Sequence, residues 1–121
     1  MANSAGTTLS ATRVALGSAA WTAPNRTTKL FGLDPESNPQ SAFLARCFGV
    51  RDFALAVAAT RSTGPSKRLA LQLGVVCDIF DIGAAMLAGR NGTMRAPAVL
   101  VVGATGLLAA GLGIAALQAD E

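Results

Sequence analysis

Ionisable side chains inside apolar segments are the part of this sequence most able to support chemistry. Two long apolar segments, 39–60 and 66–89, each contain charged residues well away from their ends. These residues are Arg46, Arg51, Asp52, Asp78 and Asp81. An apolar environment and a neighbouring like charge both favour the protonated carboxylic acid, which can then donate a proton. The three aspartates are therefore the candidate catalytic residues of the chain.

Cofactor and metal chemistry receive less support from the sequence. The stretch VLVVGATGLLAAG (residues 99–111) has the glycine spacing of a dinucleotide-binding turn. Such a turn functions between two strands, with an acid about 20 residues further on, and only Asp120 and Glu121 follow here. The acids of DIFD (residues 78–81) could ligate Mg²⁺ or bind a prenyl diphosphate, but two carboxylates make a poor site for Mg²⁺. We expect no cofactor and no metal.

The composition predicts that the elements around these charges are membrane helices. Hydrophobic residues make up 51% of the chain and charged residues 14%, against roughly a quarter in typical globular domains. Residues 96–117 contain no charge, and about 20 apolar residues suffice for a helix to cross a bilayer. A soluble helical bundle would need a polar face on this helix, and the segment provides none. The net charge of +3 is small and scattered, so we expect no nucleic acid as a partner.

The expected fold is all-α, an integral membrane four-helix bundle with short loops that forms one domain over residues 1–121. Its helices are predicted over about 7–23, 39–60, 66–89 and 96–117, and Pro39, Pro65 and Pro97 fall at or near the first turns of the last three. The first helix is the least certain, because it is short and contains Arg13; it either spans the bilayer or lies partly along its surface. We expect a multi-pass protein of the cell membrane.

Glycines are predicted to serve as packing positions in this bundle. Small residues four apart let neighbouring helices approach closely in lipid, where large side chains bring no additional hydrophobic gain. The glycines expected to pack helices are Gly49, Gly74, Gly103, Gly106, Gly111 and Gly113.

The charges within the second and third segments should meet one another near the bilayer midplane. Arg51 and Asp78 lie near the midpoints of antiparallel segments, so we expect them to pair as an intramembrane salt bridge. Asp81 shares a helix face with Asp78 and lies closer to Arg46, which either pairs with it or extends to the membrane surface. Three carboxylates face one guanidinium at this depth, or two, which predicts that at least one acid is protonated. The cluster either fixes helix register or forms a functional site.

The same residues carry a family resemblance. RCFGVRDFALAV (46–57) followed by CDIFDIGAAMLAG (77–89) resembles an uncharacterised family of small four-helix membrane proteins, itself similar to the DoxX-like group. The resemblance covers most of the chain and rests on Gly49, Arg51, Asp52, Asp78 and Asp81. It implies a four-helix membrane fold and brings no established reaction.

Three classes of function remain open at this point. The first is a non-catalytic membrane protein, either a subunit or a binder of a lipophilic molecule. The second is an enzyme of isomerase, epoxide hydrolase or cyclase type, with a buried aspartate as proton donor to a lipophilic substrate. The third is an oligomeric proton-coupled transporter. The expected partners are membrane lipid, a lipophilic small molecule or a membrane protein, and further copies of the chain. We favour the first class, because the sequence has no histidine, no tyrosine and no clear nucleophile motif.

Overall fold

The computed structural model describes residues 4–119, and this part of the chain is entirely helical, with no strand. Its five helices correspond to the four expected segments plus one short addition. They are α1 (Ser4–Thr22), α2 (Pro24–Leu30), α3 (Ser41–Arg61), α4 (Gly64–Arg90) and α5 (Ala96–Ala119). The short helix α2 begins at Pro24, in a region expected to be a turn and loop. Pro39 precedes α3 rather than lying in its first turn, and Asp120 and Glu121 fall outside the described residues.

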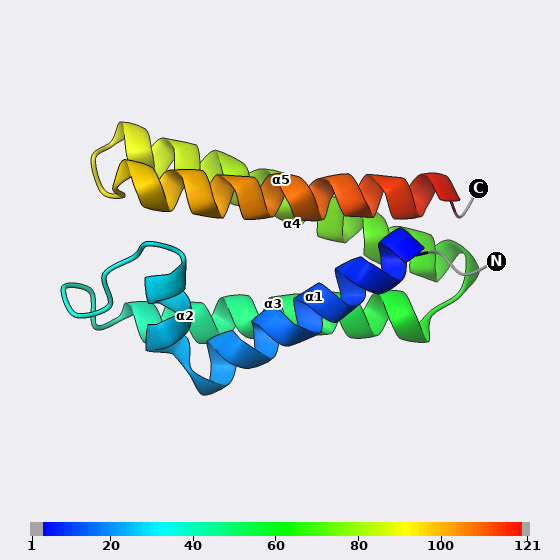
Figure 1. Cartoon of the computed structure of the whole chain (residues 1–121). Helices are drawn as coiled ribbons and strands as arrows, with labels where there is room; N and C mark the ends of the chain where they lie inside the picture. Colours follow the sequence, from blue (N-terminus) through cyan, green and yellow to red (C-terminus); the bar gives the residue numbers. More distant parts are fainter. Residues whose placement is uncertain (1–3, 120–121) are drawn as a thin grey trace.

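The long helices are arranged as two pairs. Helix α1 packs along α3, and α4 packs along α5; contacts of α1 with α5 and of α3 with α4 join the pairs (Figure 1). The start of α1 and the end of α5 lie at one end of the bundle, while α2, the loop after it and the α4–α5 turn lie at the other (Figure 1). Because the connections after α3 and α4 are short, consecutive helices run antiparallel, as the sequence predicts.

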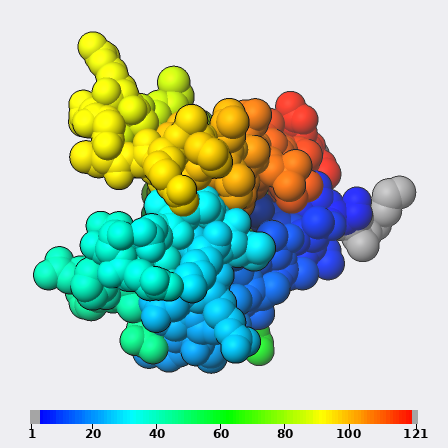
Figure 2. All heavy atoms as spheres, turned by 60° about the vertical axis from the view of Figure 1, so that its left-hand side comes forward, coloured from blue at the N-terminus to red at the C-terminus, as the bar shows by residue number. Residues whose placement is uncertain are grey.

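The loop end of the bundle is held by polar contacts. The loop from Phe31 to Gln40 reaches α5, where Gly32 packs against Ala98 in a positive-φ conformation that favours glycine. Arg95 donates a 3.0 Å hydrogen bond to the Gly32 carbonyl. The Ser37 hydroxyl and backbone N–H donate to Asp34 and hold the pKa of that carboxyl below its usual value. Figure 2 shows this end, with α2 and the loop covering one helix pair beside the α4–α5 turn.

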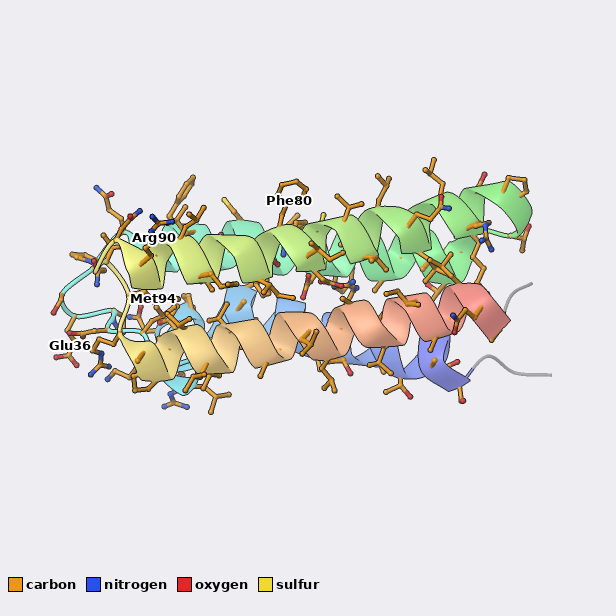
Figure 3. All side chains as sticks on the ribbon, turned by 90° about the horizontal axis from the view of Figure 1, so that it is seen from above. Glu36, Phe80, Arg90 and Met94 are labelled. Carbon is orange, nitrogen blue, oxygen red and sulfur yellow. The ribbon has the colours of Figure 1, made fainter. Side chains whose placement is uncertain are left out.

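The distribution of apolar side chains is the reverse of that in a soluble protein. Small apolar residues are buried, and large ones are exposed. The buried apolar residues of the described chain are nine alanines and two leucines, Leu9 and Leu71. Twenty large apolar side chains are exposed, and they occur on all five helices. Phe80, for example, is 72% exposed and points away from the bundle, whereas Glu36, Arg90 and Met94 lie at the loop end (Figure 3). The bundle therefore presents its bulky apolar groups outward around a core of small residues.

Four of the six glycines expected at packing positions lie at close contacts. A Cβ added to Gly49 would be 2.6 Å from the Gly17 carbonyl oxygen, and one on Gly113 would be 2.6 Å from Val75 Cγ2. Gly106 faces the Asp78 carbonyl and Ile82, and Gly74 faces the Arg13 guanidinium.

The other two glycines differ from that expectation. Added Cβ atoms at Gly103 and Gly111 would meet nothing within 4 Å. The buried row of α5 runs through Gly106, Ala110 and Gly113, and Gly111 lies on the exposed side of the helix. Within this chain, neither Gly103 nor Gly111 brings two helices together.

Candidate functional site

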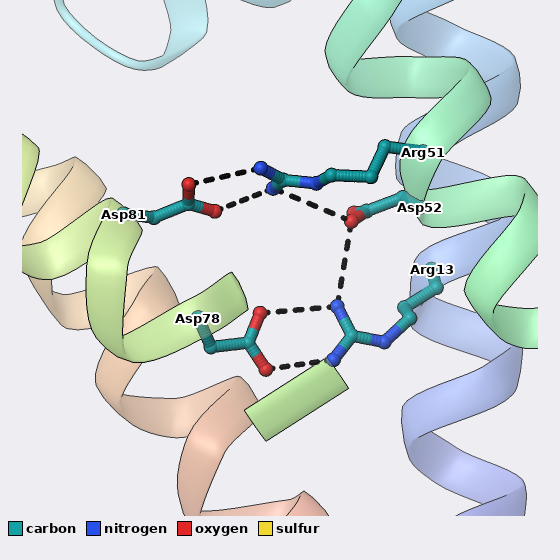
Figure 4. Close-up of polar contacts among 5 residues, drawn as sticks. All are labelled: Arg13, Arg51, Asp52, Asp78 and Asp81. Atoms are coloured by element: carbon teal, nitrogen blue, oxygen red, sulfur yellow. Dashed lines mark hydrogen bonds and ion pairs between the residues drawn. The ribbon is translucent and has the colours of Figure 1, made fainter. Parts of the chain in front are cut away.

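The most deeply buried charges form an ion pair between α1 and α4, called here the inner pair. Arg13 Nη1 lies 3.1 Å from Asp78 Oδ1, and Nη2 lies 2.7 Å from Oδ2, so the guanidinium binds the carboxylate through two parallel hydrogen bonds (Figure 4). The two side chains are only 6% and 4% exposed. Gly74 leaves room for the guanidinium, because a Cβ there would lie 3.0 Å from Arg13 Nη2. This arrangement satisfies both charges without access to solvent.

A second ion pair, called the outer pair, joins α3 to α4. Arg51 Nη1 and Nη2 lie 3.0 and 2.5 Å from the two carboxylate oxygens of Asp81. The guanidinium carbon also lies 5.0 Å from the centre of the Phe48 ring, within the range of a cation–π contact. These side chains are 35% and 28% exposed, in contrast to the inner pair. The outer pair is therefore the part of the charge cluster that another molecule can approach.

Asp52 on α3 lies between the two pairs and belongs fully to neither. Its Oδ1 is 3.4 Å from Arg13 Nη1 and 3.9 Å from Arg51 Nη2, and its side chain is 4% exposed (Figure 4). Both guanidiniums already bind another carboxylate through two bonds. Asp52 is consequently the excess acid of a cluster that contains three carboxylates and two guanidiniums.

Helix geometry explains how one short sequence pattern reaches two partners. Arg51 and Asp52 are consecutive, so their side chains leave α3 about 100° apart, one toward α4 and the other toward α1. Asp78 and Asp81 are three residues apart and share a face of α4. The close approach of Gly17 and Gly49 brings α1 against α3 within about one turn of both Arg13 and Asp52.

The structure corrects the pairing expected from the sequence. Arg51 binds Asp81 rather than Asp78, and Asp78 is bound by Arg13. Segment midpoints located Arg51 and Asp78 at similar depth, but depth alone does not determine which faces of two helices meet. Arg46 does not join the cluster; its Nε donates a 3.0 Å hydrogen bond to the carbonyl of Trp21.

Arg13 is the site residue that sequence reasoning missed. From the sequence, Arg13 is expected in the first helix without a partner. The sequence does indicate that Arg13 needs a partner, because it is the only charged residue of α1 and lies near the middle of that helix. With three acids and one firmly placed cation on the other helices, a second deep cation was the missing partner.

The surroundings of the cluster limit what it can do chemically. The cavity next to Arg13, lined by residues such as Leu9 and Leu71, has a volume of about 10 Å³, room for a single water. The inner pair and Asp52 therefore have no adjoining space for a substrate at this cavity. Within residues 4–119, no group of three acid, histidine or cysteine side chains is arranged to hold a metal ion. The aspartates are instead held by arginines.

Comparisons of the chain with family models, with curated proteins and with solved structures find no match in any of the three. The resemblance to small four-helix membrane proteins of the DoxX-like kind stays a prediction.

Proposed function

We propose that this chain is a small, non-catalytic, multi-pass membrane protein that binds a lipophilic molecule bearing a polar group, or serves as a subunit beside another membrane protein. The observation that carries the proposal is the inverted distribution of side chains. Arg13, Asp52 and Asp78 are 5%, 3% and 3% exposed, while twenty large apolar side chains point outward. In water such a surface would favour aggregation, whereas in a bilayer it is the surface that lipid solvates.

The lengths of the helices support a membrane location. Helices α4 and α5 are long and apolar enough to cross a membrane by length and composition. Helices α1 and α3 carry charges at mid-length, and on insertion scales each deep charge costs about 2.5–3.5 kcal/mol. Arg13 and Arg51 bind acids on other helices of the bundle. These ion pairs offset part of the free energy that inserting each charged helix alone would cost.

The two halves of the cluster have separate roles in this proposal. The inner pair links α1 to α4 across the bundle and fixes their relative position, a role that buried polar groups have in some helical assemblies. The outer pair is about one-third exposed, in a region where lipid tails would provide no hydrogen-bonding partner. A hydroxyl, carbonyl or amide group on a lipophilic ligand, or on a neighbouring helix, would satisfy Arg51 and Asp81 at that point.

A second candidate is a membrane enzyme that performs acid–base chemistry on a lipophilic substrate. The observation in its favour is the excess carboxyl of Asp52, which lies beside Arg51 and so is linked to the accessible Asp81. With Arg51 turned to Asp52, Asp81 would be the unpaired acid that holds the proton and donates it to a substrate bound at the outer pair. An isomerase, epoxide hydrolase or cyclase reaction that begins by protonating its substrate would use such a donor.

Native mass spectrometry of the protein released from mild detergent tests the proposal. We expect the wild-type chain to retain a stoichiometric small molecule or a reproducible protein partner. The variant Arg51→Gln with Asp81→Asn should lose it, while Arg90→Gln, which alters an exposed charge at the loop end, should keep it. Retention of the same partner by the double variant would contradict the role of the outer pair. Turnover of the retained molecule by the wild-type protein would favour the enzyme.

A further inference from the structure

A groove on the outer surface between α1 and α3 is separate from the charge cluster. It has a volume of about 300 Å³, at the lower end of the range for small-molecule pockets. Its lining includes Gly17 and Trp21 on α1 and Gly49, Val50, Phe53 and Ala54 on α3. The glycines form its floor, because the two backbones touch there, and the half-exposed rings of Trp21 and Phe53 form part of its sides. The groove is therefore apolar and open toward the surroundings of the bundle.

A cation lies at one end of this groove. Arg46 is four residues before Val50 and eight before Ala54, so all three follow one row along α3. Its Nε donates to the carbonyl of Trp21, a residue of the groove wall, which ties the guanidinium to that end. Within residues 4–119, Arg46 makes no ion pair, unlike Arg13 and Arg51. The terminal nitrogens of Arg46 thus carry a positive charge that no acid of the described chain balances.

We propose that this groove binds one anionic phospholipid, with an acyl chain between α1 and α3 and the phosphate on Arg46. Charge complementarity selects this occupant, because basic side chains at the ends of membrane helices bind lipid phosphates. From Gly49 to Ala54 the groove follows α3 for about 7.5 Å, the rise of five helical residues, and Arg46 lies three residues before it, toward the headgroup level. Trp21 lies near the end of α1, where tryptophan typically marks the membrane interface. The inference rests on the membrane location proposed above.

A second copy of the chain would fit the charge of this groove less well. In a two-fold dimer about the membrane normal, the Arg46 of each copy would lie at the same depth. The dimer would therefore bring two positive charges to the same depth of the membrane. A lipid phosphate would instead neutralise the charge of Arg46.

The test compares two lipids that differ only in headgroup. The full chain in mild detergent is titrated with phosphatidylglycerol or with phosphatidylcholine of identical acyl chains, and lipid adducts are counted by native mass spectrometry. We expect one phosphatidylglycerol to bind about fivefold more tightly than phosphatidylcholine, because the choline cation offsets the phosphate charge that phosphatidylglycerol presents to Arg46 unopposed. Arg46→Gln should abolish the preference, and Arg26→Gln, which removes an exposed charge from α2, should keep it.

A second variant tests the groove itself. Ala54→Leu places a larger side chain in the groove and should reduce binding of phosphatidylglycerol, while Ala104→Leu, on the exposed side of α5, should not. Circular dichroism confirms that each variant keeps its helices.

Three outcomes would overturn the inference: equal binding of both lipids, an unchanged preference in Arg46→Gln, or dimers without lipid that Ala54→Leu dissociates. Membrane extraction with alkaline carbonate is run alongside. If the protein stays in the membrane and shows no preference, only this site is wrong; if carbonate releases the protein, the proposed function fails as well.

Discussion

Gly17 and Gly49 are in backbone contact where α1 crosses α3. A Cβ on either residue would lie 2.6 Å from the carbonyl oxygen of the other, closer than two such atoms can approach. This contact lies about one helical turn from both Arg13 and Asp52, so the spacing of the two helices also determines how the cluster is assembled.

Substitution of Gly49 by alanine should therefore destabilise the protein. The helices must separate or shift, and overpacking of this kind typically costs about 1–3 kcal/mol. Thermal unfolding in detergent should show a lower midpoint for Gly49→Ala. The matched control is Gly111→Ala, where an added Cβ meets nothing within 4 Å and the helix propensity of alanine should stabilise α5 slightly. Equal effects of the two substitutions would show that the close crossing is absent.

The identity of the ion pairs can be measured with double-mutant cycles. Arg13→Gln combined with Asp78→Asn should be less destabilised than the sum of the single variants, because residues in direct contact show coupling energies of about 0.5–3 kcal/mol. Arg51→Gln with Asp81→Asn should behave in the same way.

The crossed combinations provide the control for these cycles. Arg51→Gln with Asp78→Asn should show weaker coupling than either true pair, since no direct contact joins these residues in Figure 4. Coupling that is strongest between Arg51 and Asp78 would restore the pairing expected from segment midpoints.

The three aspartates should respond differently to replacement by asparagine, which mimics the neutral acid. Asp52→Asn should be tolerated, because Asp52 has only longer contacts to the two guanidiniums and is the excess carboxyl. Asp78→Asn should be strongly destabilising, at about 3–5 kcal/mol, because it deprives buried Arg13 of its bidentate partner. Thermal stability at neutral pH compares them. If all three variants are equally destabilised, the cluster has no excess acid, and the enzyme candidate loses its proton donor.

Sequence reasoning located the helices better than the contacts between them. The uncharged run 96–117 and the prolines at or near the starts of the later helices reflect local physics, and α5 and α4 occur close to the expected boundaries. Contact partners depend on the rotation of each helix about its own axis. A position near a segment midpoint carries no information on that rotation, which is why Arg51 was assigned to Asp78.

Arg13 and Gly17 show a second limit. Both lie in α1, the shortest of the four long helices, and each acquires its role only from residues of α3 or α4. Gly103 and Gly111 show the converse: small residues four apart are common on α5, and the sequence does not distinguish the row that meets a neighbour from the row that does not. The chemistry of the cluster was visible in the residue types, whereas its connectivity required the fold.

The central claim is that the outward apolar surface faces lipid. The most direct measurement labels single cysteines with a water-soluble maleimide in opened membranes, in a background in which Cys47 and Cys77 are replaced by alanine. Phe80→Cys, on the exposed face of α4, should react slowly in membranes and fully after denaturation, while Asn91→Cys, in the α4–α5 turn, should react at once. If Phe80→Cys in the opened membranes reacts as fast as Asn91→Cys before denaturation, water reaches the middle of α4. That result would contradict a membrane-spanning bundle.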